Sequence, residues 1–479
     1  MLLLAIILLP AALAIPAAFL PSNRLRTWLV PIGGFIHLIL TLMAVVAAPS
    51  SAAGPMLGLD ALGALILLVV SLLYAVSSIY AIGYLHCHMS WGTRTNIVCL
   101  LLFLSAMSLA TMARNLGLLW VAVESTTLVS APLIYYHQNK LSIEATWKYL
   151  LLCSVGIALA MLGIFFVAYA GLAGGQEGTL QLDHVLGAAA LYSRLWLRAG
   201  FVFLLVGFGT KMGLAPLHSW KPDVYGEAPG LIGGLLAGGL TSIAFLAILR
   251  AMQIMAAAGE QPLARHLLLV LGVFSLGLAA VFVVRQKDIK RMLAYSSIEH
   301  MGILAIGVGI GDLATYGAMF HILNNALTKG ALFMSAANIH RYYGSKRMCE
   351  TQGSLGLLPF SASLFLAGFL AITGSPPFST FVSEFTILRT IFAINSPVLA
   401  IAILLLLAMV FIGMGRTVIP VTVGPAMEEY REPPQYRETL LTIASPLLLM
   451  AMIFCLGIYL PAPLDDLFSR AASIVEVSR

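Results

Sequence analysis

Long apolar stretches, separated by short polar segments, fill nearly the whole chain. A bilayer core requires about 20 apolar residues per helix, so each such stretch predicts a membrane-spanning helix. Turn residues, Gly/Pro clusters and charges divide the chain into about 14 of these spans. The predicted spans begin near residues 2, 27, 60, 95, 115, 143, 197, 229, 265, 287, 313, 358, 397 and 439.

Two longer polar interruptions divide the apolar pattern. The segment from Gly174 to Arg194 is long enough for a short interfacial helix. The segment from Met427 to Glu438 alternates charge sign and contains a Pro pair, which predicts a solvated loop.

Composition places the chain in the all-α polytopic membrane class, with the lipid bilayer as its surroundings. The chain has 479 residues, of which 60% are hydrophobic and 10% charged, and its mean hydropathy is +0.97. Its five cysteines form no C-x-x-C motif, and no glycine-rich nucleotide motif is present. We therefore expect no cofactor, no metal and no redox centre in this chain. The net charge of +6 is assigned to basic loops at a membrane face, so nucleic acid is not an expected partner.

Basic residues concentrate in the loops that follow odd-numbered spans, and Lys221 and Lys290 are counted among them. The positive-inside rule then places both termini on the outer side of a bacterial inner (plasma) membrane.

Two predicted spans are interrupted by glycine and proline. The seventh contains G-T-K-M-G-L-A-P and the twelfth contains T-G-S-P-P-F. The two breaks are five spans apart, a pattern typical of repeated transporter units with a site near the middle of the membrane.

Ionisable residues within these spans are costly and therefore predict a functional site. Glu124 lies ten residues after Arg114, about 15 Å along a helix, and is expected to pair with Lys211 in the seventh span. The alternative for Glu124 is a neutral, structural carboxyl. Lys148 follows Glu144 by four residues near the start of a span, where an interfacial, snorkelling position is the alternative.

A second group of titratable residues lies in the later spans. His321, Asn325 and Lys329 are spaced by four residues, which places them on one helix face over about 12 Å. Glu299 and His300 are neighbours and point about 100° apart, so we expect at most one of them to face the interior. The predicted proton pathway comprises Glu124, Lys148, Lys211, His218, His300, His321, Lys329 and Glu384.

Four motifs resemble those of the antiporter-like subunits of respiratory complex I, Mrp-type antiporters and membrane-bound hydrogenases. They are A-Y-S-S-I-E-H-M-G, H-x-x-x-N-x-x-x-K, G-T-K-x-G-L-x-P-x-H-x-W and G-S-P-P-F-x-x-F-x-S-E-F. The motifs are most similar to the hydrogenase-4 component F type, and the likeness covers roughly residues 60 to 460.

The resemblance implies 14 helices with two inverted five-helix repeats and discontinuous seventh and twelfth helices. It implies helices 1–3 at residues 1–94, a first repeat at 95–257, a second repeat at 265–420, and a loop with the last helix at 421–479. Relatives commonly carry a lysine or histidine in the eighth span, where this chain has Ser242. They often have histidine at the position of Asn325, and W-L-P where this chain reads W-K-P.

The function that follows from the motifs and the resemblance is proton translocation within a multi-subunit redox-driven complex of the hydrogenase-4, formate hydrogenlyase or complex I kind. The redox module then resides in partner subunits, so whether the chain counts as part of an enzyme is left open, as is coupling to Na⁺. Two alternatives remain: a subunit of a cation/proton antiporter without a redox partner, and a non-conducting scaffold.

Overall fold

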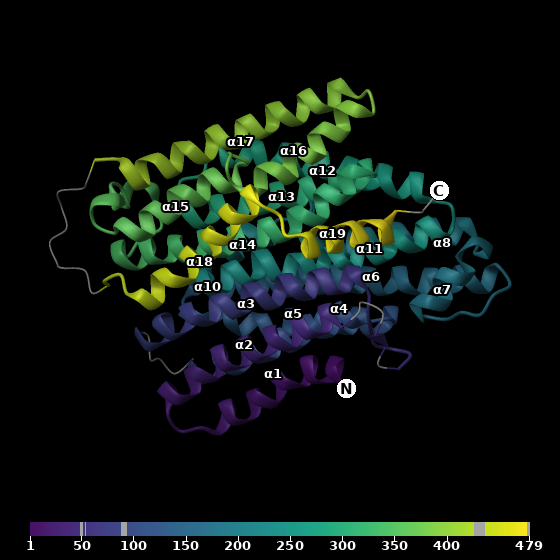
Figure 1. Cartoon of the computed structure of the whole chain (residues 1–479), viewed down its shortest axis with the longest axis horizontal. Coiled ribbons are helices and arrows are strands. Elements are labelled where there is room, and N and C mark those ends of the chain that lie inside the picture. Colours follow the sequence, from purple (N-terminus) through teal and green to yellow (C-terminus); the bar gives the residue numbers. More distant parts are fainter. Residues whose placement is uncertain (48–50, 53, 88–92, 426–435, 477–479) are drawn as a thin grey trace.

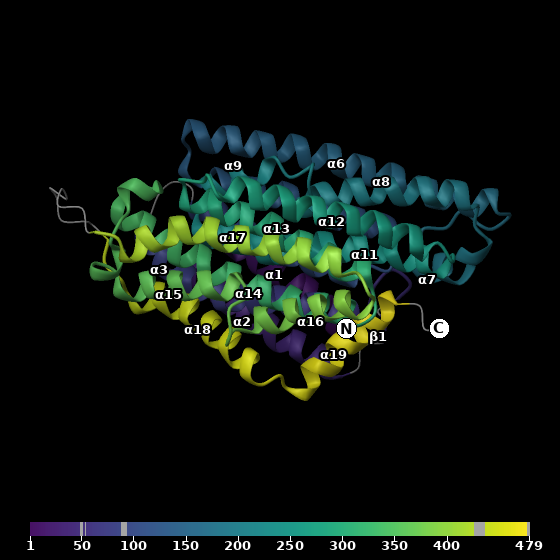
Figure 2. The same cartoon turned by 90° about the horizontal axis from the view of Figure 1, so that it is seen from above.

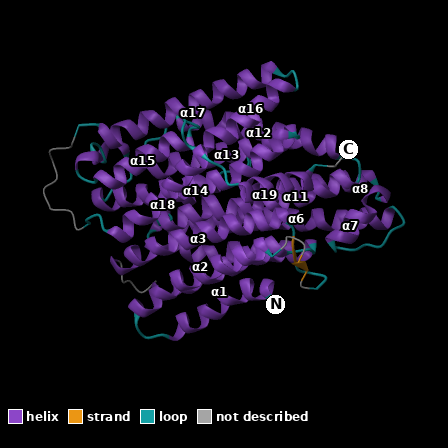
Figure 3. Ribbon diagram, in the orientation of Figure 1, coloured by secondary structure: helices purple, strands orange, loops and turns teal. Residues whose placement is uncertain are grey.

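A computed structural model describes residues 1–47, 51–52, 54–87, 93–425 and 436–476. Long helices lie side by side across the molecule, and the first and last helices of the described chain begin and end toward the same side of the bundle (Figures 1 and 2). Helix accounts for nearly all of the regular structure (Figure 3). Within the described residues, the β-structure consists of the short antiparallel pair β1 (Ser51–Ala52) and β2 (Gly58–Leu59) and three isolated bridges.

The helices follow the predicted pattern closely. They are α1 (Leu2–Phe19), α2 (Asn23–Val46), α3 (Ala61–Cys87), α4 (Thr93–Met112), α5 (Leu116–Ile134), α6 (Lys140–Ala173), α7 (Leu182–Ala188), α8 (Arg194–Met212), α9 (Trp220–Glu227), α10 (Gly230–Leu235), α11 (Thr241–Ala257), α12 (Gln261–Val283), α13 (Ile289–Ile310), α14 (Leu313–Tyr343), α15 (Pro359–Ile372), α16 (Ser379–Ala393), α17 (Pro397–Val423), α18 (Leu440–Ile458) and α19 (Ala462–Val475). Short helical turns are η1 (Tyr135–His137), η2 (Ala189–Leu191), η3 (Leu236–Leu240, a π turn), η4 (Met348–Glu350) and η5 (Ser354–Gly356).

Twelve helices of the described chain are long and apolar enough to cross a membrane, so the protein is an integral membrane protein. The helix α14 has 31 residues but is not among the twelve. Its interior contains several polar side chains, among them His321, Asn324, Asn325 and Lys329. The pair α15 and α16 is also outside the twelve, because the second predicted break divides it into helices of 14 and 15 residues.

Both predicted breaks are present. The helix α8 ends at Met212 because Gly213 adopts a left-handed conformation with φ of 78°, and helix resumes at α9. The second break lies between α15 and α16, where Gly374 has φ of 65°. A short helix, α7, forms in the segment after Gly174 for which a short helix was predicted. Most of the predicted solvated loop after Met427 lies outside the described residues.

The centre of the bundle is a group of helices buried on nearly all sides. In the most apolar stretch of α3 and of α13, 89% of the residues are buried. In that of the continuous helix α10–η3–α11, all residues are buried. The helix α14 packs against α3, α10, α13, α15, α16 and α18. The outer helices α1, α2, α6, α12, α17 and α18 are only 33–39% buried and expose apolar side chains, as expected next to lipid or other membrane subunits. Polar side chains on the central helices are therefore shielded from both water and lipid.

Candidate functional site

Lys211 lies in the last turn of α8, immediately before the first break, and is fully buried. Its Nζ donates hydrogen bonds to Thr127 Oγ1 at 2.5 Å and to Tyr149 OH at 2.9 Å. The same amine lies 4.8 Å from the centre of the Tyr149 ring. The helices α5 and α6 thus supply hydroxyl oxygens and an aromatic face to an amine that has no access to solvent.

Glu124 is connected to Lys211 through one intervening hydroxyl. Thr127 donates from Oγ1 to Glu124 Oε2 at 3.0 Å, and Ser154 donates to Oε1 at 2.8 Å. Because Thr127 also accepts from Lys211, amine, hydroxyl and carboxylate form a continuous series. The expected pair is therefore bridged by a hydroxyl and is not a direct contact. Glu124 itself is only partly buried, at the outer seam of α5 and α6.

Lys221 is a buried lysine that the sequence analysis wrongly assigned to a loop. It lies in α9, which folds back into the bundle against α6 and α13, and its exposure is 0%. Its Nζ donates a long hydrogen bond of 3.3 Å to Ser297 Oγ. Its methylene chain occupies the space over Gly213, where a Cβ would lie 2.2 Å from Lys221 Cε. Lysine in W-K-P, directly after a helix break, was the available signal for this position.

Lys290 was assigned to a loop in the same way and is also buried. It lies in the first turn of α13 and donates from Nζ to the carbonyl oxygen of Ala228 at 3.1 Å. The sequence prediction therefore overestimated the number of basic residues in the loops, because Lys221 and Lys290 are buried inside the protein.

Lys329, on α14, approaches the same helix as Lys221. Its Nζ donates to Ser296 Oγ at 2.7 Å and to the carbonyl oxygen of Leu293 at 3.4 Å. Ser296 and Ser297 are neighbours on α13, so one serine accepts from Lys329 and the next from Lys221. The S-S pair of the A-Y-S-S-I-E-H motif therefore connects two buried lysines that come from opposite halves of the chain.

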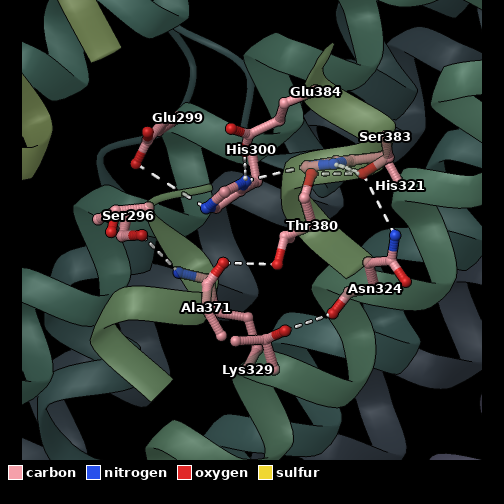
Figure 4. Close-up of polar contacts among 12 residues, drawn as sticks. Ser296, Glu299, His300, His321, Asn324, Lys329, Ala371, Thr380, Ser383 and Glu384 are labelled. Atoms are coloured by element: carbon pink, nitrogen blue, oxygen red, sulfur yellow. Dashed lines mark hydrogen bonds and ion pairs between the residues drawn. The ribbon is translucent and has the colours of Figure 1, made fainter. Parts of the chain in front are cut away.

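Beyond Lys329 lies a compact buried cluster of histidines and carboxylates (Figure 4). The rings of His300 and His321 are joined by a hydrogen bond of 3.0 Å between Nδ1 and Nε2. His321 Nδ1 contacts Ser383 Oγ at 2.9 Å. Glu384 Oε1 lies 3.9 Å from His300 Nδ1, and Glu299 Oε2 lies 3.9 Å from His300 Nε2. His300, His321 and Glu384 also form a group whose ligand atoms all lie within 4.8 Å, a geometry suited to a metal ion.

The prediction that at most one of Glu299 and His300 faces the interior was wrong. Both are buried, at 2% and 0% exposure. The helix α13 is enclosed by α9, α12, α14, α16 and α17, so side chains that diverge by about 100° both remain inside.

The predicted ladder on α14 is only partly connected. Asn325 is buried, and neither of its amide atoms has a hydrogen-bond partner. Its neighbour Asn324 instead donates to Ser383 Oγ at 3.2 Å and accepts from Ser379 at 2.8 Å. The four-residue spacing from His321 and Lys329 singled out Asn325, whereas the neighbouring Asn324 makes the hydrogen bonds.

Lys148 and His218 are only partly buried, unlike these groups. Lys148 forms ion pairs with Glu144 at 2.6 Å and Asp223 at 2.8 Å, and its side chain is 44% exposed. His218 is partly buried in the first break. Ser242 donates its hydroxyl to the carbonyl oxygen of Gly238 within the π turn at 2.6 Å, so its proton is committed to the backbone.

A separate ion cluster lies between β2 and the start of α3. Asp60 accepts from both terminal nitrogens of Arg250, at 2.5 and 2.8 Å, and from Arg114 at 3.2 Å. Burial alone raises the pKa of Asp60, but the charge and hydrogen bonds of Arg250, with help from Gly63 and Arg114, lower it to about 2. This cluster fixes the position of the buried guanidinium of Arg250, which is 2% exposed.

Comparison with known proteins identifies the architecture. Residues 113–411 match the family described as NADH:quinone oxidoreductase/Mrp antiporter, TM. The chain belongs to this family. A hydrogenase-4 component F homolog from Methylacidiphilum infernorum (isolate V4) is 33% identical over 78% of both chains. Hydrogenase-4 component B of Escherichia coli (strain K12) is 32% identical over 75% of this chain and 54% of that protein.

Chains of solved membrane complexes share the fold. A chain of the archaeal membrane-bound sulfane sulfur reductase superposes with a TM-score of 0.88 at 21% identity, covering 99% of this chain and 97% of that one. A chain of the Mrp complex from Dietzia sp. DQ12-45-1b gives 0.83 at 20% identity, with the same coverage. The relatives are subunits of multi-subunit membrane complexes, and the predicted likeness to the hydrogenase-4 and complex I group is confirmed.

Proposed function

We propose that this chain is a proton-translocating subunit of a redox-driven, multi-subunit complex of the hydrogenase-4 or complex I kind in a bacterial inner membrane. The observation that carries the proposal is the alignment of three lysines, each 0% exposed, between carboxylates of the two halves. Burying an ammonium group costs several kcal/mol, so three such residues indicate a function other than stability. They are Lys211, Lys221 and Lys329.

The proposed pathway has a first segment from Glu124 through Thr127 to Lys211. The next step of the pathway runs from Lys211 to Lys221. Cys153 lies close enough to interact electrostatically with both lysines. Because no direct hydrogen bond joins these two lysines, water is required for transfer between them.

The second segment passes from Lys221 to Lys329 along the serine pair of α13, and then toward the buried cluster. Lys329 lies within electrostatic reach of Glu299, which adjoins His300. From there His321 and Glu384 continue the polar contacts. We leave Lys148 and His218 out of this central series because neither side chain forms a hydrogen bond or ion pair with a member of it.

In this mechanism, the distance between Glu124 and Lys211 controls whether the amine holds its proton. A partner subunit that moved the carboxylate away would leave the desolvated ammonium without its counter-charge, and the proton would move toward Lys221. Electrons are carried by redox partners in other subunits. A scaffold is disfavoured because oxygen atoms of Glu299 and Glu384 are buried without hydrogen-bond partners, which a purely structural core avoids.

We further propose 14 spans, counting α14 and the broken pair α15–α16 with the twelve, arranged as two inverted repeats within residues 95–257 and 265–420. An even number of spans agrees with the start of α1 and the end of α19 lying toward the same side of the bundle (Figure 1). Positive loop charge makes that side of the bundle the outer one.

The decisive experiment measures proton pumping by dye quenching in inverted vesicles that contain the assembled complex. Lys211→Met and Glu124→Gln should abolish pumping while assembly and electron transfer at the redox centre persist. Lys346→Met, which removes a partly buried lysine at the loop before η4, is the matched control and should pump normally. Normal pumping by both Lys211→Met and Glu124→Gln would refute the pathway. Pumping without a redox substrate, driven by a cation gradient alone, would favour the antiporter alternative.

A further inference from the structure

We propose that His300, His321 and Glu384 form an intramembrane binding site for a divalent metal ion of the zinc class. The three residues come from α13, α14 and α16, and their ligand atoms lie within 4.8 Å of one another (Figure 4). All three are buried, at 0%, 0% and 8% exposure. The proposal concerns ion binding and does not depend on the proposed function.

The spacing of the ligand atoms fits a small tetrahedral ion. Two ligands at zinc distances of about 2.1 Å are about 3.4 Å apart at a tetrahedral angle. The nitrogens of His300 and His321 are 3.0 Å apart, and Glu384 Oε1 is 3.9 Å from His300 Nδ1. These two values lie on either side of the ideal separation, and the third, between His321 and Glu384, is at most 4.8 Å. Changes of up to about 1.4 Å in these separations therefore produce three ligands with the fourth position open.

Hydrogen bonds already orient the first ligand. Ser383 donates its hydroxyl to the carbonyl oxygen of Thr380 at 2.9 Å, so toward His321 it can only accept. We infer that His321 Nδ1 carries the proton, which leaves the Nε2 lone pair directed at His300. A second hydrogen bond that fixes the tautomer of a ligating histidine is the usual support for a metal site.

The second ligand requires one proton shift. Since His321 Nε2 accepts, His300 Nδ1 must donate in the apo protein. Metal binding would move that proton to His300 Nε2, which is buried without a partner and lies 3.9 Å from the unpartnered Glu299 Oε2. The carboxylate of Glu299 would then accept from the ligating ring.

Two features indicate that the third ligand is available. Glu384 Oε1 is buried, has no hydrogen-bond partner and faces the histidines. Its other oxygen, Oε2, lies against Gly374 in the second break, where a Cβ would be only 2.2 Å away.

Two imidazoles with a carboxylate favour zinc, cobalt or nickel over Na⁺, Mg²⁺ or Ca²⁺, which prefer sets of oxygen ligands. The carboxylate of Glu384, which is a ligand, and that of Glu299, which accepts from His300, together carry two negative charges that balance a divalent ion.

The test uses the full-length chain, purified in detergent with a tag free of histidine and cysteine. The exposed thiols of Cys349 and Cys455 are replaced by serine, because thiolates bind zinc on their own. Titration with Co²⁺ should give one equivalent of the visible absorption bands typical of four-coordinate cobalt, and Zn²⁺ should displace it. Absorption fine structure of the zinc form should show nitrogen and oxygen ligands at about 2.0–2.2 Å without sulfur.

Variants then assign the ligands. Glu384→Gln and His321→Gln should lose the cobalt bands, and Ser383→Ala should weaken binding by about 10–100-fold. His37→Gln is the matched control, because His37 is equally buried but both of its ring nitrogens are hydrogen-bonded to serines. Thermal unfolding without metal verifies that each variant is folded, and Glu384→Asp replaces Glu384→Gln if needed. The site would be overturned if the parent showed no four-coordinate cobalt. It would also be overturned if Glu384→Gln and His321→Gln both bound cobalt as tightly as the parent.

A last arm separates this site from the proposed function. If the pathway runs through His321, Zn²⁺ should slow redox-driven pumping in the assembled complex at concentrations that occupy the site. Occupancy by Co²⁺ and Zn²⁺ without any effect on pumping would uphold the metal site and refute the proposed second segment of the pathway.

Discussion

Replacing Lys221 by methionine should separate stability from function. The amine is fully buried and has one long hydrogen bond, to Ser297 at 3.3 Å. Burial of an ammonium costs several kcal/mol, and one hydrogen bond to a charged group returns about 1.5–3 kcal/mol. Methionine has a similar length, so it fills the space over Gly213 without the polar atom. We therefore expect the free energy of unfolding to rise by about 1–3 kcal/mol while pumping is lost.

The assay pairs thermal unfolding of the purified chain with dye quenching in vesicles. Lys346→Met is the control of opposite sign, because its Nζ contacts Glu227 Oε1 at 2.5 Å and the carbonyl oxygen of Gly226 at 2.9 Å. That change leaves a carboxylate without its partner, so stability should fall by about 1–3 kcal/mol with pumping unchanged. A loss of stability in Lys221→Met together with normal pumping would show that Lys221 is a structural residue, and the reasoning would fail.

Two further perturbations test other contacts. Thr127→Val removes the bridging hydroxyl and should slow pumping by about tenfold or more, whereas Thr126→Val, whose hydroxyl bonds only the backbone of its own helix at 2.6 Å, should have little effect. Equal rates in the two valine variants would exclude the bridge. Asp60→Asn should lower the unfolding free energy by about 3–5 kcal/mol, because it leaves Arg250 buried and unpaired. The pKa of Asp60 is lowered from 3.8 to about 2, so its stabilisation of about 2 kcal/mol is complete above pH 3.8 and is lost as the pH falls toward 2. The difference in unfolding free energy between the parent and Asp60→Asn, measured between pH 2 and pH 6, should therefore narrow by about 2 kcal/mol at the acid end; a constant difference would contradict this.

The helical framework was predictable because long apolar stretches and Gly/Pro breaks are local signals. The break at Gly213 followed from composition alone, and its left-handed backbone explains why α8 ends there. The sequence also predicted a span at α14. Its buried polar side chains lower its hydropathy, so it is not among the twelve helices apolar enough to cross a membrane. What the periodicity could not supply was the set of neighbours around each helix, which depends on packing between distant segments.

Most of the titratable residues of the candidate site were predicted from the sequence, but the contacts among them were not. Lys211 and Glu124 were expected to touch, and a threonine one helical turn from the carboxylate separates them. Lys221 was misplaced because a lysine next to a proline reads as a loop residue until α9 is seen to fold inward. The expectation that only one of Glu299 and His300 faces the interior came from helix geometry, which ignores that a helix surrounded by others buries side chains on all of its faces.

Column-by-column comparison of sequences treats Ser242 as the loss of a charge that relatives carry on the eighth span. The position of Lys221 shows why such a tally misleads: this amine enters the buried interior from α9, a short helix outside the eighth span, so the buried amines cannot be counted along that span alone. For this chain, the quantity that matters is the number of amines that reach the protein interior, whichever helix contributes each of them. Relatives that lack a lysine in the eighth span are best searched for a compensating one after the first break.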